Sequence, residues 1–258
     1  MSASGRGIVA ALLGCAAVAA CTGISTDPGL PLSIQFDSLP AQAVVVGDTM
    51  RGGDQLPARL ALQAFNSSGN VVSDTQLRVI GIDTASTNAF EVISGLRLVG
   101  RTVAAAVRVV GQAGLLQSQT QTFAIVLAPT SISRIPSDSA DSLVYDRLDT
   151  SARFVDTRVR VLAGSTALSG LRVRLSVVSA TDSIVDSVRL VSSASGRNVS
   201  SVLLNAGDAS VRVKAYKKST ARGRGVVTLE ASIRARGLDV PGSPLRFPIR
   251  LVPFTLPP

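Results

Sequence analysis

Residues 171–177 read LRVRLSV, and this stretch decides the fold class. Leucine or valine stands at every second position, with arginine or serine between them. Successive side chains of a β-strand point to opposite faces, so the pattern predicts a strand with one buried and one solvated face. Strands of this kind pair in antiparallel sheets that cover a core on one side. We therefore expect an all-β protein.

The same alternation recurs on both sides of this stretch, separated by turn residues. In the first half of the chain we expect strands at 32–37, 43–46, 60–65, 76–82, 90–93, 96–99, 102–110 and 121–127. In the second half we expect them at 142–145, 158–161, 171–177, 188–190, 199–204, 210–214, 225–234 and 247–252. Short strands at this spacing are typical of β-sandwiches. Pro248 and Pro253 suggest an edge position for the last strand.

Glycine and asparagine mark the connections between these strands. We expect hairpin turns at Ser94-Gly95 and at 163–166, and a further turn at 205–208. In the turn at 66–70, Gly69 tolerates a positive φ and the Asn66 side chain can cap the backbone. Pro129 cannot continue a central strand and marks a domain boundary. The predicted order is residues 1–20 as signal peptide, 21–30 as tether, 31–128 as one sandwich and 129–258 as a second, basic one.

Two segments of the first half resemble bacterial Ig-like domains of the invasin and intimin type. They are VVGDT at 45–49 and AFNSSGNVVSD at 64–74. Asn66 stands where that family more often has aspartate, and Arg78-Val79-Ile80 replaces its usual tryptophan. A weaker likeness spans 168–175 and 207–213. The resemblance implies two tandem Ig-like antiparallel β-sandwiches that act without catalysis in adhesion, spacing or envelope interaction.

The first residues have the pattern of an export signal. Arg6 precedes an uncharged apolar run, 7–20, that is too short to span a bilayer as a helix. Val18-Ala19-Ala20-Cys21 resembles a bacterial lipobox, which implies cleavage before Cys21 and attachment of lipid to its sulfur. Leu12-Leu13-Gly14-Cys15 is the alternative site, and a plain secreted protein is the other reading. Because Thr22 rather than aspartate follows the cysteine, the resemblance implies the outer membrane.

Composition argues against most catalytic sites. The chain has no histidine, only two glutamates and only two cysteines, both in the signal region. Histidine-based triads and zinc sites are therefore excluded, and no phosphate-binding or dinucleotide motif is found. We expect no enzyme, no cofactor and no metal site. The acidic stretch with Asp138, Asp141, Asp146 and Asp149 could offer oxygens to Ca²⁺, but solvated loop is the simpler reading.

The positive charge lies in the second half of the chain. Residues 1–150 have a net charge of −2, and residues 151–258 have +11. Such an excess favours an anionic partner, although arginine can also serve simply as a solvent-facing residue. The densest cluster predicts a polyanion-binding loop for envelope glycolipid or polysaccharide, with nucleic acid not expected; it comprises Lys214, Lys217, Lys218, Arg222 and Arg224. Another surface protein is the other candidate partner, besides the membrane reached through the lipid.

Overall fold

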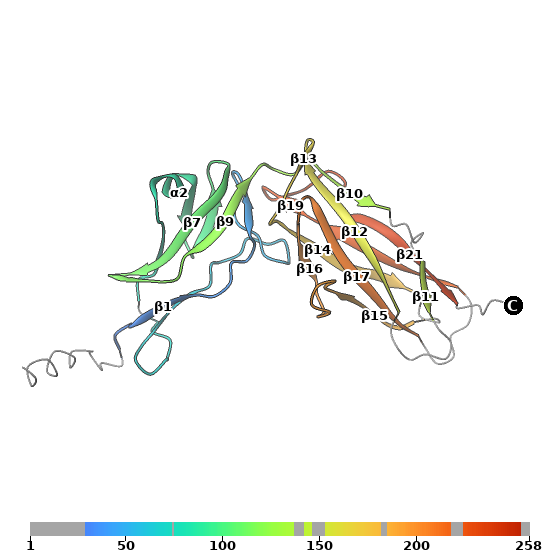
Figure 1. The fold of residues 1–258 in the computed structure, drawn as a ribbon, viewed down its shortest axis with the longest axis horizontal. Coiled ribbons are helices and arrows are strands. Elements are labelled where there is room, and N and C mark those ends of the chain that lie inside the picture. The colour runs from blue at the N-terminus through green and yellow to red at the C-terminus, as the bar shows by residue number, and fades with distance from the viewer. Residues whose placement is uncertain are drawn as a thin grey trace, which may run out of the picture.

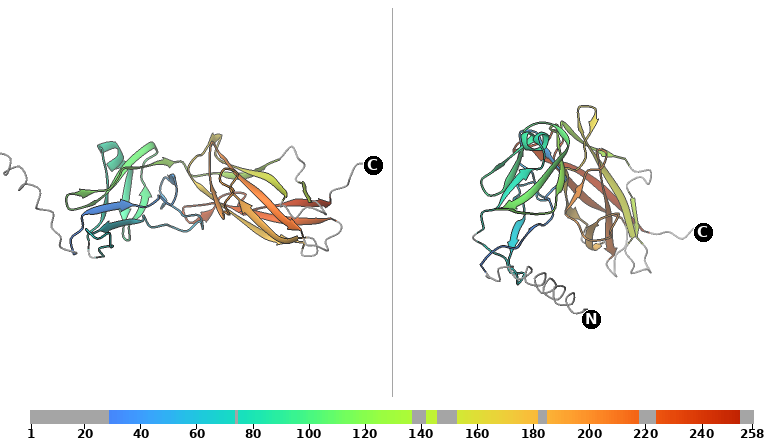
Figure 2. Two further views of the ribbon diagram at one scale, coloured as in Figure 1. Left: turned by 60° about the horizontal axis from the view of Figure 1, so that its bottom comes forward. Right: turned by 60° about the vertical axis from the view of Figure 1, so that its left-hand side comes forward.

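The chain forms two β-sandwiches that lie end to end (Figures 1 and 2). The computed structural model describes residues 29–73, 75–136, 142–145, 153–181, 185–217 and 224–253. Strands β1 to β9 build the first sandwich, and strands β10 to β21 build the second. β1 begins at the end of the first sandwich that is remote from the second (Figures 1 and 2). The predicted all-β class with two tandem sandwiches is confirmed.

The first sandwich contains short strands and one helical turn. Its elements are β1 (Ser33–Phe36), β2 (Ala43–Val45), β3 (Leu62–Phe65), β4 (Arg78–Gly81), α2 (Thr84–Ala89), β5 (Phe90–Ile93), β6 (Arg97–Gly100), β7 (Ala104–Ala113), β8 (Leu116–Gln117) and β9 (Gln121–Val126). One sheet has the order β2-β9-β7-β4, with β8 paired to β7. The pairs β1-β3 and β5-β6 lie on the other side of the core, joined by the Leu60 N–H to Leu96 carbonyl hydrogen bond of 2.8 Å.

Apolar side chains of both layers meet in the first core. The alternation at 60–65 is confirmed, since Leu60, Leu62 and Ala64 are buried and Gln63 is exposed. Phe90 and Phe123 meet edge to face, with ring centroids 6.0 Å apart. The remaining members include Ile34, Phe36, Val44, Met50, Val79, Leu98, Val107, Val109 and Ile125.

Local turn chemistry follows the sequence. Gly69 has a φ of +77°, and the Asn66 Oδ1 accepts hydrogen bonds from the N–H groups of Ser68 and Asn70, at 3.0 and 2.9 Å. The helix α2 was not predicted, because its six residues hold no apolar period of 3.6. Asp83 caps this helix, accepting from the Ser86 N–H at 2.7 Å. That hydrogen bond, with the Arg108 guanidinium, lowers the pKa of Asp83 below its usual value.

The second sandwich has longer strands. Its elements are β10 (Ser131–Ile135), β11 (Ser142–Tyr145), β12 (Arg153–Ala163), β13 (Thr166–Ala167), β14 (Arg172–Ala180), β15 (Val185–Val191), β16 (Ser201–Leu203), β17 (Asp208–Lys217), β18 (Gly225–Ser232), β19 (Arg234–Ala235), β20 (Leu238–Asp239) and β21 (Leu245–Pro253). One sheet has the order β10-β12-β17-β15 and the other β11-β21-β18-β14-β16. The first sheet therefore has four strands in its main order, and the second is built around the three central strands β21, β18 and β14. Four strands packed against three is the arrangement of an Ig-like sandwich.

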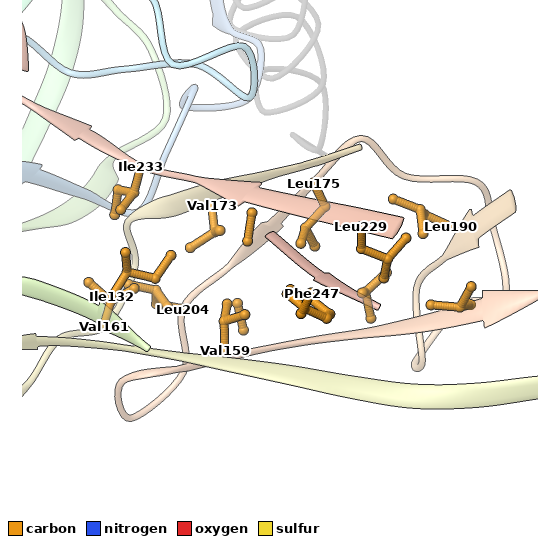
Figure 3. Close-up of a cluster of buried hydrophobic side chains, with 14 of the residues drawn as sticks. Ile132, Val159, Val161, Val173, Leu175, Leu190, Leu204, Leu229, Ile233 and Phe247 are labelled. Carbon is orange, nitrogen blue, oxygen red and sulfur yellow. The ribbon is translucent and has the colours of Figure 1, made fainter. Parts of the chain in front are cut away.

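Alternation along these strands places every second side chain in the second core. Val173 and Leu175 of β14 are 0% and 3% exposed, whereas Arg174 between them is exposed. Figure 3 shows Val159, Leu175, Leu229 and Phe247, from both sheets, pointing toward one another. Among the described buried residues of this core, Phe247 is the one aromatic residue, and the others are valine, leucine, isoleucine and alanine.

Three details differ from the sequence-based expectations. The sheets are not purely antiparallel, because β2 pairs with β9 and β11 with β21 in parallel. The first strand of the second half is β10, which precedes the expected strand at Ser142–Tyr145. The strand β21 lies between β18 and β11 instead of at the edge. Pro248 is tolerated there because β11 covers only Arg250–Pro253, so the strand has one neighbour at Pro248.

One buried polar group in the second core is left without a partner, and it gives a prediction. Thr157 on β12 is 4% exposed, and its hydroxyl makes no hydrogen bond to the described part of the protein. Replacing it by valine keeps the shape and removes the desolvated hydroxyl. We expect Thr157→Val to raise the free energy of unfolding by about 1 kcal/mol and the melting temperature by about 3–5 °C. The measurement is thermal unfolding followed by circular dichroism.

The exposed Thr166 on β13 supplies the matched control for this prediction. Thr166→Val removes the same hydroxyl from the surface and should leave the melting temperature nearly unchanged. A loss of stability in Thr157→Val would show that a bound water satisfies the hydroxyl, contrary to the prediction.

Candidate functional site

The most extensively built polar site lies at the junction of the two sandwiches. The strand β2 is buried at all three positions, unlike the half-solvated strands around it. Val44 packs into the first core, whereas Ala43 and Val45 pack into the second core. Because alternate side chains of a strand point in opposite directions, β2 is held between the two cores. The run of apolar residues at 43–46, which lacks polar alternation, is explained by this double burial.

Backbone contacts fix the same segment against the second sandwich. The Gly170 carbonyl accepts from the N–H groups of Gln42 and Ala43, both at 3.0 Å. Gly170 has a φ of +79°, and a Cβ there would lie 2.9 Å from the carbonyl carbon of Gln42. Arg172 donates from Nε to the Pro40 carbonyl at 2.5 Å. The chain can approach this closely only because residue 170 has no side chain.

The carboxylate of Asp48 connects the two sandwiches. Asp48 is 7% exposed and receives the Arg51 guanidinium in a bidentate pair, Nε to Oδ2 at 2.9 Å and Nη2 to Oδ1 at 3.0 Å. The Arg236 N–H, from the second sandwich, donates to Asp48 Oδ2 at 2.6 Å. The Arg236 side chain reaches back to the Val46 carbonyl through Nε and Nη2, at 3.1 and 2.9 Å. The VVGDT motif therefore holds the interdomain contact.

Gln55 makes a second polar connection that no sequence signal indicated. Its side chain is 3% exposed, and its Nε2 donates to the Arg172 carbonyl at 2.8 Å. Its Oε1 accepts from the Arg234 N–H at 3.0 Å, and its own carbonyl accepts from Arg51 Nη1 at 2.8 Å. Gln55 and Arg236 both have positive φ, at 68° and 51°. Such backbone strain persists where the surrounding contacts determine the conformation.

A cleft of about 620 Å³ opens beside this junction. Its charged groups are largely engaged, since Arg234 lies 3.2 Å from Asp239 and Arg246 lies 2.7 Å from Glu230. In the described ranges no group of three or more acidic, cysteine or histidine side chains could hold a metal ion. Across the same ranges, no helix is long and apolar enough to cross a membrane.

The structure describes the side chains of two members of the predicted polyanion-binding cluster, Lys214 and Arg224. Lys214 lies on the outward face of β17, and Arg224 is exposed immediately before β18. Lys217 is part of β17, but its side chain is not described, and Lys218 and Arg222 lie outside the described residues. Cys15 and Cys21 also lie outside them, as do Asp138, Asp141, Asp146 and Asp149. Of the two members whose side chains are described, Lys214 lies on a sheet face and Arg224 lies at the start of a strand.

Lys214 belongs to a larger cationic surface, which the prediction of a polyanion-binding loop did not include. The outward side chains of the β10-β12-β17-β15 sheet form what we call the basic face, comprising Phe154, Asp156, Arg158, Arg160, Arg189, Asp208, Arg212 and Lys214. Arg160 pairs with Asp208 at 2.8 Å and Arg212 with Asp156 at 3.0 Å. These hydrogen bonds raise the pKa of both guanidinium groups. The signal that could have revealed this face is the arginine at alternate positions of the strands.

No family model and no curated protein matches this chain. Among solved structures, the chain is similar to the Yersinia pseudotuberculosis adhesin InvE, with 12% identity, 85% of this chain and 57% of that chain covered, and a TM-score of 0.33. The D0-D1 domain of intimin matches at 12% identity, with 86% and 98% covered and a TM-score of 0.27. The S-layer protein rSbsC(31-844) matches at 11% identity, with 88% and 28% covered and a TM-score of 0.29.

The chain spans about a third or less of three of the matching S-layer protein structures, and just over half of the InvE structure. The assignment of two tandem Ig-like sandwiches is carried by the strand order and the two cores of the chain itself.

Proposed function

We propose that this protein is a non-catalytic spacer of the cell envelope, which holds its basic second sandwich at a set distance from a lipid-anchored N-terminus. The observation that carries the proposal is the double burial of β2, with Val44 in one core and Val45 in the other. A strand shared in this way resists bending between the modules, because any hinge motion would expose apolar surface of one core.

The polar contacts at the junction support the same function. Asp48 and Gln55 of the first sandwich are both nearly buried, and the side chain of each is hydrogen-bonded to backbone groups of the second sandwich. Buried hydrogen-bonded groups of this kind hold a single geometry, because separation would leave them desolvated and unpaired. Domains within one chain usually move relative to one another unless the interface between them is large and apolar, and here apolar side chains of β2 enter both cores. A rigid pair of modules is suited to spacing.

Distance measurements between spin labels test the rigidity. Leu115 is fully exposed at the tip of the β7–β8 turn, and Ala194 is exposed after β15 in the second sandwich. We expect the doubly labelled Leu115→Cys/Ala194→Cys protein, with both native cysteines replaced by serine, to show one narrow distance distribution. A broad distribution, like that of modules on a flexible linker, would reject the spacer function.

The anchor is proposed from the sequence of the signal region. Because the lipobox resemblance favours Cys21 over Cys15, we expect Cys21→Ser to abolish incorporation of an alkyne-labelled fatty acid during expression in a bacterial host. Two or three acyl chains bind a membrane firmly, at about 0.8 kcal/mol for each buried CH₂, so the variant should also leave the membrane fraction. Cys15→Ser is the matched control and should be labelled like the parent protein. Labelling that follows Cys15 instead would reassign the anchor.

A further inference from the structure

We infer that the basic face of the second sandwich binds a linear anionic polysaccharide. Of the described side chains that define this face, five are cationic and two are anionic, so their formal charges sum to +3. Asp156 and Asp208 are already engaged by Arg212 and Arg160. In the described part of the chain, Arg158 and Lys214 form no ion pair with an acidic residue. These charges stand on regular strands and are not on a loop.

The spacing of these cations fits a polymer better than a single small anion. Lys214 faces Phe154 on one neighbouring strand and Arg189 on the other, in one row across the sheet. Arg158 lies four residues along β12 from Phe154, which corresponds to about 13 Å at ~3.3 Å per residue. A flat surface with separated charges cannot enclose one ion, but a chain that carries repeated anions can contact several cations at once. Linked weak contacts of this kind add to a substantial affinity.

An exposed aromatic ring on the same face points to sugar as the backbone of this polymer. Phe154 is 52% exposed, although phenylalanine is usually buried. The Arg212 guanidinium lies 3.9 Å from its ring centroid and is held there by two hydrogen bonds to Asp156, of 3.0 and 3.2 Å. The ring therefore has a fixed position beside the cations. It offers an apolar contact to the C–H groups of a sugar ring, whose acidic substituents meet Lys214 and Arg158.

The choice of a polysaccharide over a lipid surface rests on the proposed function. The N-terminal side of β1 lies at the far end of the first sandwich, so a rigid junction holds the basic face away from an anchor at that end (Figures 1 and 2). A polymer that extends from the envelope reaches this position, whereas the anchoring membrane does not. Electrostatic attraction to anionic lipid also falls off within a Debye length of the surface.

The opposite sheet of the same sandwich provides a matched control. Its outward face carries Arg174 on β14 and Arg250 on β21, both exposed. Arg158→Ser/Lys214→Ser and Arg174→Ser/Arg250→Ser therefore remove the same charge from opposite faces. Binding of the full mature chain to polygalacturonate is measured by calorimetry, with neutral dextran as the uncharged polymer and phosphatidylglycerol vesicles as the lipid surface.

We expect Arg158→Ser/Lys214→Ser to weaken polygalacturonate binding about 10–30-fold at low salt, and Arg174→Ser/Arg250→Ser to weaken it no more than about threefold. Phe154→Ala, made in the parent protein, should also weaken polygalacturonate binding, and the salt dependence of binding should stay that of the parent protein. Equal losses in both double variants, no binding by the parent protein, or preference for vesicles over the polymer would each overturn the inference. Because this binding needs neither the anchor nor the junction, its failure is distinct from a failure of the spin-label experiment.

Discussion

Gly170→Ala is expected to uncouple the two sandwiches while each keeps its fold. The new Cβ would lie 2.9 Å from the Gln42 carbonyl carbon and 3.0 Å from the Ala43 nitrogen, both in the other sandwich. Atoms of the backbone cannot rotate away, so β2 must move from the second core. The positive φ of +79° adds about 1 kcal/mol of strain. Together we expect a loss of about 3–4 kcal/mol in the free energy of unfolding, with a strongly broadened distance distribution between labels at 115 and 194.

Gly164→Ala separates the two causes. Gly164 also has a positive φ, at 62°, but a Cβ there would meet no atom within 4 Å. This control therefore carries the backbone strain without the collision, and it should lose about 1 kcal/mol with an unchanged distance distribution. If both variants lost the same stability and kept a narrow distribution, close packing at Gly170 would not be what holds the modules together.

Asp48→Ala is expected to have the second largest effect on the free energy of unfolding. Its cause is the loss of a buried charge and not a steric collision. The substitution leaves the Arg51 guanidinium, 12% exposed, without its carboxylate, and leaves the Arg236 N–H without its acceptor. Removing one partner of a nearly buried ion pair costs more than the pair itself contributes, because the other charge stays desolvated. We expect a loss of about 2–4 kcal/mol in the free energy of unfolding, measured in denaturant.

Two further variants test this cause. Asp37→Ala removes an exposed carboxylate just after β1 and should change stability by less than about 0.5 kcal/mol. Asp48→Asn keeps one acceptor for the Arg236 N–H but removes the charge, so its loss should be intermediate. A fully stable Asp48→Ala protein would mean that the apolar contacts of β2 hold the junction alone.

Much of the fold could be predicted because the alternation of apolar and polar residues is visible within each single strand. Val173 and Leu175, Val211 and Val213, and the residues at 60–65 alternate with polar neighbours, and each set is buried as expected. The position of β21 was predicted wrongly, since Pro248 excludes a partner strand only at its own site. The helix α2 and the parallel pairings β2-β9 and β11-β21 leave no clear local pattern.

The candidate sites were predicted less well. The motif around Asp48 was noticed as a resemblance, but its role in joining the sandwiches was not. No sequence pattern distinguished Gln55, because single glutamine residues are common in loops. The basic cluster was predicted on a loop, and among its members with described side chains Lys214 belongs to the basic face. Arg158 and Arg189 are far from Lys214 in the chain and come beside it only through strand pairing.

The amino-acid sequence by itself determined the all-β class, the approximate position of most strands and the accumulation of positive charge in the second half. Alternation acts within a single strand, and composition acts over the whole chain. The tertiary structure alone decided that β2 is shared by two cores and that Arg236 reaches Asp48, 188 residues away. It also decided which arginines share one face. The physical reason is that such contacts depend on how finished sheets pack against each other, and no local pattern encodes that packing.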